Sequence, residues 1–109
     1  MAVVYKTLGQ SAPAATTETD LYTVPASTST IVSSLLVCNR GASNATFRVS
    51  ISLAGGATAT KDYLYYDVII PPNDTFIATI GATMATTDKI RVYASNASLS
   101  FSAWGSELT

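Results

Sequence analysis

The acidic residues are the first candidates for chemistry, because the chain contains no histidine. Histidine is the commonest general base and a member of most Ser-His-Asp, Cys-His and zinc sites. Asp62 and Asp67 flank the stretch "YLYY", and their odd spacing puts them on opposite faces of a strand. Asp74 and Asp88 each fall in a predicted turn, where Asp forms local hydrogen bonds. A glycosidase requires two carboxyl groups that face each other across a sugar, and the sequence proposes no such pair.

Other site-forming patterns are also weak. "SLAGGATATK" holds two glycines and a later lysine without the spacing of a phosphate-binding loop, so we interpret it as a mobile hairpin loop. The N-x-[ST] matches at Asn44, Asn73 and Asn96 would accept glycans only in a secreted protein, and we interpret them as turn asparagines. The single cysteine, Cys38, cannot form an internal disulfide and is predicted to be a buried, inert thiol. We therefore predict no enzymatic activity, no cofactor and no metal site.

Aromatic residues offer the better candidates for binding. "YLYYD" places three tyrosines within four residues, and strand alternation puts Tyr63 and Tyr65 on one face. Trp104 alternates with the apolar residues of its strand and should lie on an outer face. Tyrosine and tryptophan give rigid contact area and are enriched at interfaces. The alternative for the tyrosines is a core strand whose phenols reach the rim. The candidate interface residues are Val3, Val4, Tyr5, Tyr63, Tyr65, Tyr66 and Trp104.

The elements that must position these residues are strands. Period-2 alternation recurs between turn clusters, and no segment of ten or more residues shows a helical period. We predict an all-β fold, a single antiparallel β-sandwich of jelly-roll-like form with about eight short strands. The expected strands are 3–8, 20–24, 30–39, 45–54, 63–70, 75–80, 89–95 and 98–107.

The stretch "ATFRVSISLAG" alternates strictly and predicts two different faces. Its apolar face continues into the predicted core, whereas its second face is made almost wholly of hydroxyls. That second face could meet water, another protein or a sugar, and we expect solvent or protein before sugar. The predicted inward residues are Phe47, Val49, Ile51, Leu53, Phe76, Ala78, Ile80, Ile90, Val92, Ala94, Leu99, Phe101 and Ala103. The second face consists of Thr46, Arg48, Ser50 and Ser52.

Two segments point to contacts beyond a simple sandwich. The strand 30–38 is apolar on both sides, so something should cover its second side, either the same chain or a neighbouring subunit. Its alternation predicts one face with Ile31, Leu35 and Val37 and the other with Val32, Leu36 and Cys38. "AVVYKTL" reads as a detached edge strand, because a long proline-containing loop follows it, and edge strands invite pairing with another chain. We expect one domain over 1–109, and residues 1–19 are a candidate N-terminal arm of that domain.

Composition narrows the class of protein. The 109 residues are 48% hydrophobic and only 12% charged, which suits one folded domain with a weakly charged surface. A net charge of −1 and scattered basic residues argue against nucleic acid, which requires clustered Lys and Arg. No apolar run approaches the roughly 20 residues that span a bilayer. The N-terminus lacks a signal-peptide core, so we expect no membrane contact. The single cysteine suits synthesis in a reducing cytoplasm.

Five stretches together carry a family resemblance: "YKTLGQSAPAATTETDLYTVPAST", "VSSLLVCNRG", "TFRVSISLAG", "YLYYD" and "PPNDTF". In this combination the chain resembles small virion proteins of tailed bacteriophages, including phages of cyanobacteria. The resemblance covers almost the whole chain and rests on no catalytic motif. It implies a β-sandwich without enzymatic activity, present in repeated copies on a symmetric shell.

The resemblance therefore suggests a structural virion protein, a capsid cement or decoration protein that binds and stabilises the phage head. The alternative is a phage tail or fibre component, in the form of a carbohydrate-binding adhesin that stacks sugars on Tyr63, Tyr65 or Trp104. The implied partners are the major capsid protein or other virion proteins, and copies of the chain itself. Shell proteins often occupy three-fold positions, so a homo-oligomer, and a trimer in particular, is the expected state. The expected location is the virion, assembled in the cytoplasm of the host bacterium.

Overall fold

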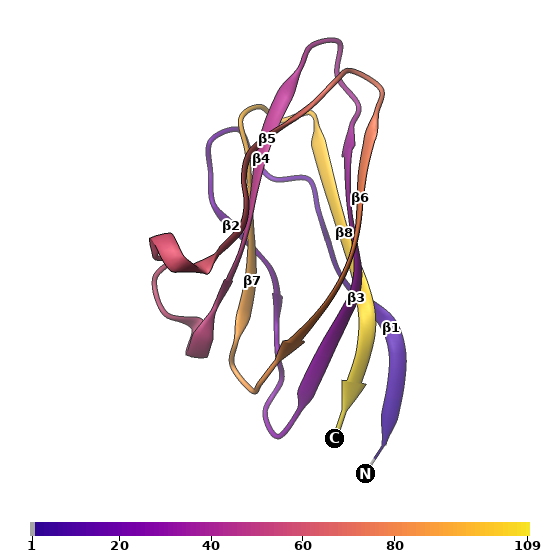
Figure 1. Ribbon diagram of the computed structural model, residues 1–109, viewed down its shortest axis with the longest axis vertical. Coiled ribbons are helices and arrows are strands. Elements are labelled where there is room, and N and C mark those ends of the chain that lie inside the picture. The colour runs from indigo at the N-terminus through magenta and orange to yellow at the C-terminus, as the bar shows by residue number, and fades with distance from the viewer. Residues whose placement is uncertain (1) are drawn as a thin grey trace.

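Eight strands form two four-stranded antiparallel sheets in the computed structural model, which describes residues 2–109 (Figure 1). The first sheet has the order β1-β8-β3-β6 and the second the order β2-β7-β4-β5. The two sheets pack face to face, which confirms the all-β sandwich expected from the alternation. The first sheet comprises β1 (Val3–Ser11), β8 (Leu99–Leu108), β3 (Ser29–Asn39) and β6 (Thr75–Met84). The second comprises β2 (Thr19–Thr23), β7 (Lys89–Ala94), β4 (Ala45–Ser52) and β5 (Tyr63–Ile70).

The N-terminal segment is part of the first sheet. The sequence allowed residues 1–19 to be an N-terminal arm. Within this range, β1 pairs with β8 along its length, from Val3 opposite Leu108 to Ser11 opposite Phe101. Met1 lies outside the described residues. β1 has no partner on its other side and is therefore an edge strand, as expected, although it is not detached.

The core lies between the sheets and contains most of the predicted inward residues. Phe47, Val49, Ile90, Val92 and Phe101 are almost fully buried, and the ring centroids of Phe47 and Phe101 are 6.2 Å apart. Ala78, Ala94, Leu99 and Ala103 are also buried, whereas Ile51, Phe76 and Ile80 are partly buried and pack against the cluster.

Leu53 is the exception, because its side chain is 68% exposed. The strand predicted over 45–54 ends at Ser52, and the chain then turns through η1 (Leu53–Gly55) and η2 (Thr60–Asp62) before β5. Leu53 is already the first residue of η1, so the alternation that predicted an inward Leu53 ends before it, and the left-handed Ala54, with φ of 56°, then turns the chain away. Neither of these short 3₁₀ segments, the helical elements of residues 2–109, is long and apolar enough to cross a membrane.

A β-bulge in β3 changes which residues face the core. Relative to β8, the pairing shifts between Val32 and Ser34, so that Ser33 is an extra residue in β3. Relative to β6 the shift at the same place runs the other way, and two residues of β6 lie opposite Ser33. Val32 therefore faces inward together with Leu35 and Val37, whereas Ile31 faces outward with Leu36 and Cys38. The two faces predicted for 30–38 were wrong for this reason, since an uninterrupted alternation places Ile31 with Leu35.

Gly105 of β8 allows β3 and β8 to approach closely at this bulge. A Cβ atom built at Gly105 would lie 1.9 Å from the carbonyl oxygen of Ile31. No side chain fits at that distance, so the bulge requires glycine at this position.

A buried polar network links the two sheets at one end of the sandwich. The hydroxyl of Tyr22 on β2 donates a hydrogen bond of 2.5 Å to the Glu107 carboxylate on β8, and it lies 2.8 Å from the hydroxyl of Thr30 on β3. Lys6 on β1 binds the other carboxylate oxygen at 3.2 Å. Burial, followed by the hydrogen bond to Glu107, raises the pKa of Tyr22 to about 12. The network therefore ties four strands together.

Candidate functional site

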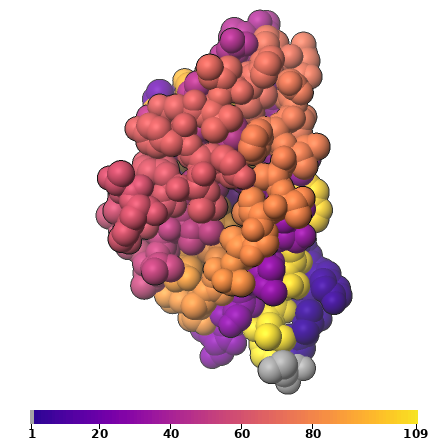
Figure 2. All heavy atoms as spheres, in the orientation of Figure 1, coloured from indigo at the N-terminus to yellow at the C-terminus, as the bar shows by residue number. Residues whose placement is uncertain are grey.

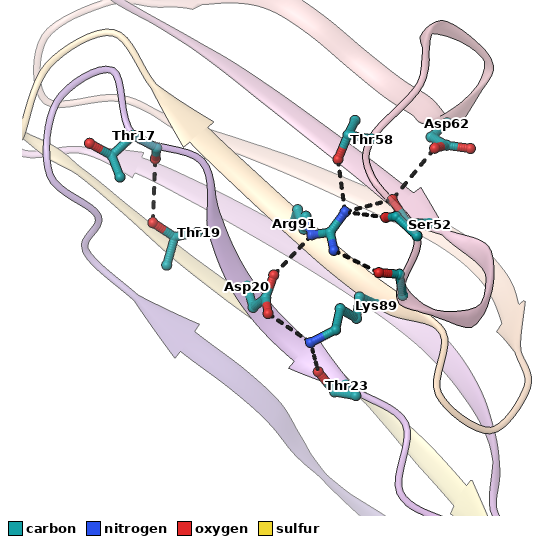
Figure 3. Close-up of polar contacts among 11 residues, drawn as sticks. Thr17, Thr19, Asp20, Thr23, Ser52, Thr58, Asp62, Lys89 and Arg91 are labelled. Carbon is teal, nitrogen blue, oxygen red and sulfur yellow. Dashed lines mark hydrogen bonds and ion pairs between the residues drawn. The ribbon is translucent and has the colours of Figure 1, made fainter.

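The densest group of polar contacts surrounds Arg91 on the outer face of the second sheet (Figure 3). Its Nε atom donates to Asp20 at 3.0 Å, and its Nη1 atom donates to the Ser52 hydroxyl at 3.1 Å. The same guanidinium binds the carbonyl oxygens of Gly55 and Gly56 at 3.1 and 2.6 Å. Asp20 also accepts a hydrogen bond of 2.8 Å from Lys89, which, together with Arg91, holds the pKa of Asp20 below its usual value. The guanidinium thus binds the segment between β4 and β5 to the sheet.

The carboxylate beyond Ser52 is also engaged in holding this segment. The Oδ2 atom of Asp62 accepts a hydrogen bond of 2.9 Å from the backbone N–H of Ala59. The Ser52 hydroxyl lies 3.5 Å from the same Oδ2 atom. The Ala59 N–H, more than the neighbouring Lys61, keeps the pKa of Asp62 below its usual value. Asp62 therefore stays ionised and fastens the loop. Its contacts do not include Asp67, which binds Arg48 instead.

The hydroxyl face of β4 is divided between the protein's own loop and the surface. Ser50 and Ser52 are each 1% exposed, and Ser52 contacts Asp62 of the segment 53–62, while Thr46 and Arg48 remain partly exposed. Figure 2 shows this segment, coloured rose, as a lobe on the left flank of the molecule. The expectation of solvent or a protein partner was therefore wrong for Ser50 and Ser52. In the described residues, the Ser50 hydroxyl is the one buried side-chain group without a hydrogen-bond partner.

Arg48 organises the aromatic residues on the same outer face. Its guanidinium carbon lies 4.3 Å from the ring centre of Tyr66 and 4.4 Å from that of Tyr93. Its Nε and Nη2 atoms bind the two carboxylate oxygens of Asp67 at 2.7 and 3.3 Å, and this contact raises the pKa of Arg48. The charged group is therefore held by stacking and by a two-point ion pair.

The tyrosines of β5 do not share a face as predicted. In the ladder with β4, Tyr63 lies opposite Ser50 and Tyr65 opposite Val49, so Leu64 is an extra residue that reverses the alternation. Tyr65 consequently points to the core and packs on Phe76, with ring centres 5.1 Å apart. Tyr63 contacts Tyr66 instead, edge to face at 4.9 Å. These two rings and Thr60 line a shallow hollow of about 330 Å³.

The outer face of the first sheet has a different character, because it is uncharged. The ladders place Tyr5, Ser106 and Ile31 in one row and Thr7, Trp104 and Ser34 in the next. A third row holds Ser102, Leu36 and Ile77, and a fourth holds Ser100, Cys38 and Thr75. No charged side chain lies in these rows, in the part of the chain that the structure describes. We call this surface the uncharged face; its members are Tyr5, Thr7, Ile31, Ser34, Leu36, Cys38, Thr75, Ile77, Ser100, Ser102, Trp104 and Ser106.

Large apolar groups stand out from the uncharged face. Tyr5 is 84% exposed, Ile77 is 68% exposed and Trp104 is 40% exposed. A hollow of about 570 Å³ lies beside Trp104 and is lined by Tyr5, Ile31 and the hydroxyls of neighbouring strands. Lys6 borders this hollow, although its ammonium group binds Glu107. Ile31 also lines a second hollow, of about 470 Å³, toward the end of the sheet.

The predicted interface residues thus lie in three places. Val3, Val4, Tyr5 and Trp104 belong to the first sheet, Tyr63 and Tyr66 lie on the outer side of the second sheet, and Tyr65 packs against the core. Ile31, Leu36 and Ile77 of the uncharged face were not among the predicted interface residues. The sequence does carry a signal for these three residues, namely long segments without charge. Residues 21–39, 75–87 and 92–106 contain no charged side chain.

Cys38 is partly exposed, so the prediction of a buried thiol was wrong. It lies on the uncharged face between Ser100 of β8 and Thr75 of β6. The β3 bulge leaves it on the outer side with Leu36. Its burial was predicted because it lies in an apolar run. In β3, however, the apolar residues of that run lie on both faces of the sheet, and Cys38 is on the outer one.

Neither a metal centre nor a family relationship provides a further assignment. Within residues 2–109, no three His, Cys, Asp or Glu side chains gather in a way that could hold a metal ion. Comparison of the sequence with protein-family models and with characterised proteins finds no match.

Proposed function

We propose that this protein is a structural protein without catalytic activity that binds other proteins through the uncharged face. The observation that carries the proposal is the separation of charge: ion pairs occupy the outer side of the second sheet, and the rows around Trp104 hold none. The centres of protein interfaces are depleted in charged residues and enriched in aromatic ones. Serine and threonine also lose less side-chain entropy on binding than Lys or Glu.

The resemblance to small virion proteins of tailed phages supports a particular setting for this function. In that setting the chain is a cement or decoration protein in the virion, assembled in the host cytoplasm, and its main partner is the major capsid protein. A shell offers many equivalent positions, so a weak contact repeated on each copy stabilises the whole particle. An uncharged face suits this role because it leaves no buried charge without a partner when it is covered.

Binding to shells tests the proposal directly. Shells of the parent phage, prepared without this protein, are mixed with the purified chain and sedimented. We expect co-sedimentation of the wild type, and loss of binding by at least about tenfold for Ile77→Glu or Trp104→Glu, since each introduces an unpaired charge. Both side chains are exposed in the free protein, so the variants should remain folded.

The matched control is Ile69→Glu, which changes an exposed isoleucine of the second sheet. It should bind shells like the wild type. Equal loss of binding in Ile69→Glu and Ile77→Glu would contradict the assignment of the face. Turnover of an ester or glycan substrate that is abolished by Asp62→Asn would contradict the absence of catalysis.

A carbohydrate-binding tail adhesin is the second candidate, and the Tyr63–Tyr66 hollow favours it. Aromatic rings beside Arg48 and Asp67 combine stacking surface with polar groups. Arg48 already covers one face of the Tyr66 ring, however, which leaves less of it for a sugar. Glycan binding that is lost in Tyr66→Ala and kept in Trp104→Ala would support the adhesin.

A further inference from the structure

The edge of β1 is the most regular of the four sheet edges. β2 has five residues with a shifted register, and β5 is interrupted by register shifts and by the left-handed Asp67. β6 has an irregularity opposite Ser33, next to Gly81 with φ of 57°. β1, in contrast, pairs with β8 without a shift from Val3 to Thr7, and these side chains are exposed. Native proteins usually interrupt, cover or charge an edge that must stay free. This stretch of β1 is neither interrupted nor covered, and the charge of Lys6 is paired with Glu107 of the neighbouring strand.

The direction of the backbone groups in β1 follows from its first pair. Ala2 and Thr109 exchange two N–H to O=C hydrogen bonds of 2.9 Å each. Hydrogen-bonded and non-hydrogen-bonded pairs alternate along an antiparallel ladder. Val4 and Lys6 therefore direct their backbone groups toward β8. Val3, Tyr5 and Thr7 direct theirs to the open edge, where they form a row of free donors and acceptors.

This row is complementary to itself. When two copies of β1 run antiparallel about a two-fold axis at Tyr5, Val3 faces Thr7 of the second copy and Tyr5 faces its equivalent. The edge-facing backbone groups of Val3, Tyr5 and Thr7 in each strand are then all hydrogen-bonded to the second copy. Lys6 faces Val4 of the second copy, so like charges are not opposed. An axis at Lys6 would oppose two lysines, and an axis at Val4 would leave Thr7 outside the pairing with the described residues.

We infer that β1 of one molecule pairs with β1 of a second copy, antiparallel and about a two-fold axis at Tyr5. The first sheet of one copy and the first sheet of the other then form one continuous sheet of eight strands. Because the axis is perpendicular to the sheet, the uncharged faces of the two copies lie on the same side and become continuous. This inference goes beyond the proposed function, since it stands on the edge of β1 and does not require a shell. It gives a dimer as the unit of assembly, where the phage resemblance suggested a trimer.

Sedimentation velocity of the purified protein from about 10 μM to about 1 mM tests the association. We expect a monomer–dimer equilibrium. Tyr5→Pro removes the outward N–H, and proline is tolerated where a strand N–H faces solvent, so the fold should persist. The dimer dissociation constant should rise at least about tenfold. Tyr5→Ala, the matched control, keeps the N–H and should retain the dimer with a smaller loss.

A cysteine pair tests the register. In a Cys38→Ser background, Tyr5→Cys places equivalent Cα atoms about 5.5 Å apart across the axis. That spacing lies within the range that a disulfide bridges. Mild oxidation should give a covalent dimer, whereas Ile77→Cys in the same background, exposed on the same sheet, should stay monomeric.

A wild type that remains monomeric at the highest concentration would overturn the inference, as would a trimer or a dimer unaffected by Tyr5→Pro. If dimers fail to form while Ile77→Glu still abolishes shell binding, this inference falls and the proposed function stands. If dimers form and the protein does not bind shells, the proposed function falls and the pairing stands.

Discussion

The Tyr22 hydroxyl and the Glu107 carboxylate join the two sheets through a hydrogen bond of 2.5 Å. Tyr22 belongs to the second sheet and Glu107 to the first, and both side chains are buried. The hydrogen bond from Tyr22, with help from Lys6, also keeps the pKa of Glu107 below its usual value. An ionised carboxylate therefore lies at the sheet–sheet boundary with its charge compensated.

Tyr22→Phe should lower the free energy of unfolding by about 1.5–3 kcal/mol at neutral pH, since it removes a hydrogen bond to a charged group. It should also change the alkaline pH dependence. The folded protein raises the pKa of Tyr22 from 10.0 to about 12, so this stabilisation is complete below pH 10 and is lost as the pH rises toward about 12. Urea unfolding between pH 8 and about 12 should show this loss in the wild type and not in Tyr22→Phe. Tyr5→Phe, at an exposed hydroxyl, should behave as the wild type.

Ser50→Ala should stabilise the protein or leave it unchanged, because the buried Ser50 hydroxyl has no partner. An unpaired buried hydroxyl costs about 1–3 kcal/mol. Ser52→Ala is the matched variant on the same face of β4, and it should destabilise the protein by about 1 kcal/mol through loss of the contact with Arg91. Thermal unfolding of both variants measures the difference. Equal destabilisation by the two would show that Ser50 has a bonding partner.

Gly105→Ala should destabilise the protein by about 1–3 kcal/mol or more, because the added methyl group collides with the Ile31 backbone at the β3 bulge. Gly56→Ala serves as the control, since a Cβ there meets only the Leu53 carbonyl oxygen at 3.6 Å. Chemical denaturation of both variants gives the comparison. A stable Gly105→Ala protein would mean that the bulge can relax.

Arg91→Lys should loosen the segment 53–62 while leaving a positive charge near Asp20. Lysine cannot reproduce the forked contacts with the Gly55 and Gly56 carbonyl oxygens. Hydrogen exchange should become faster at the Gly56 and Asp62 amides, which bond within this segment. Arg40→Lys, an exposed arginine with one hydrogen bond to the Ala97 carbonyl, should leave the exchange of these amides unchanged. Unaltered exchange in Arg91→Lys would show that the loop holds itself.

Cys38 should react with a thiol reagent in the free native protein, because its side chain is partly exposed. If shells bind the uncharged face, bound protein should be labelled several-fold more slowly than free protein. Labelling of the unfolded chain gives the reference rate. Equal labelling of free and shell-bound protein would place the contact elsewhere.

The regular parts of the fold could be predicted from sequence, and the irregular parts could not. Alternation identified Phe47 and Val49, and likewise Phe101 and Ala103, because each pair lies in an uninterrupted stretch. It failed where one extra residue enters a strand, as Ser33 does in β3. Such an insertion moves every later side chain of the strand to the opposite face of the sheet. The adjacent Ser33 and Ser34 have the same hydrophobicity, so the sequence does not show which of the two is the extra residue.

The same limit applies to the candidate sites. Trp104 was expected on an outer face and lies there, since β8 alternates regularly up to it. The cover over Ser52 depends on Arg91, which is distant in sequence and binds the loop through backbone carbonyls. Backbone acceptors carry no residue-specific signal. The uncharged face, in contrast, could be anticipated from sequence, because three long segments of the chain contain no charged residue.

If partners bind the uncharged face as proposed, its lack of charge also sets the rate and the salt dependence of that association. A contact without charges has no long-range attraction to guide collisions, so its association rate should stay near the 10⁵–10⁶ M⁻¹s⁻¹ that is roughly typical of unsteered partners. For the same reason, dissolved salt has little to screen, since the Debye length governs only interactions between charges. An assembly held together through this face should therefore form slowly at low concentration and remain intact across a wide range of ionic strength.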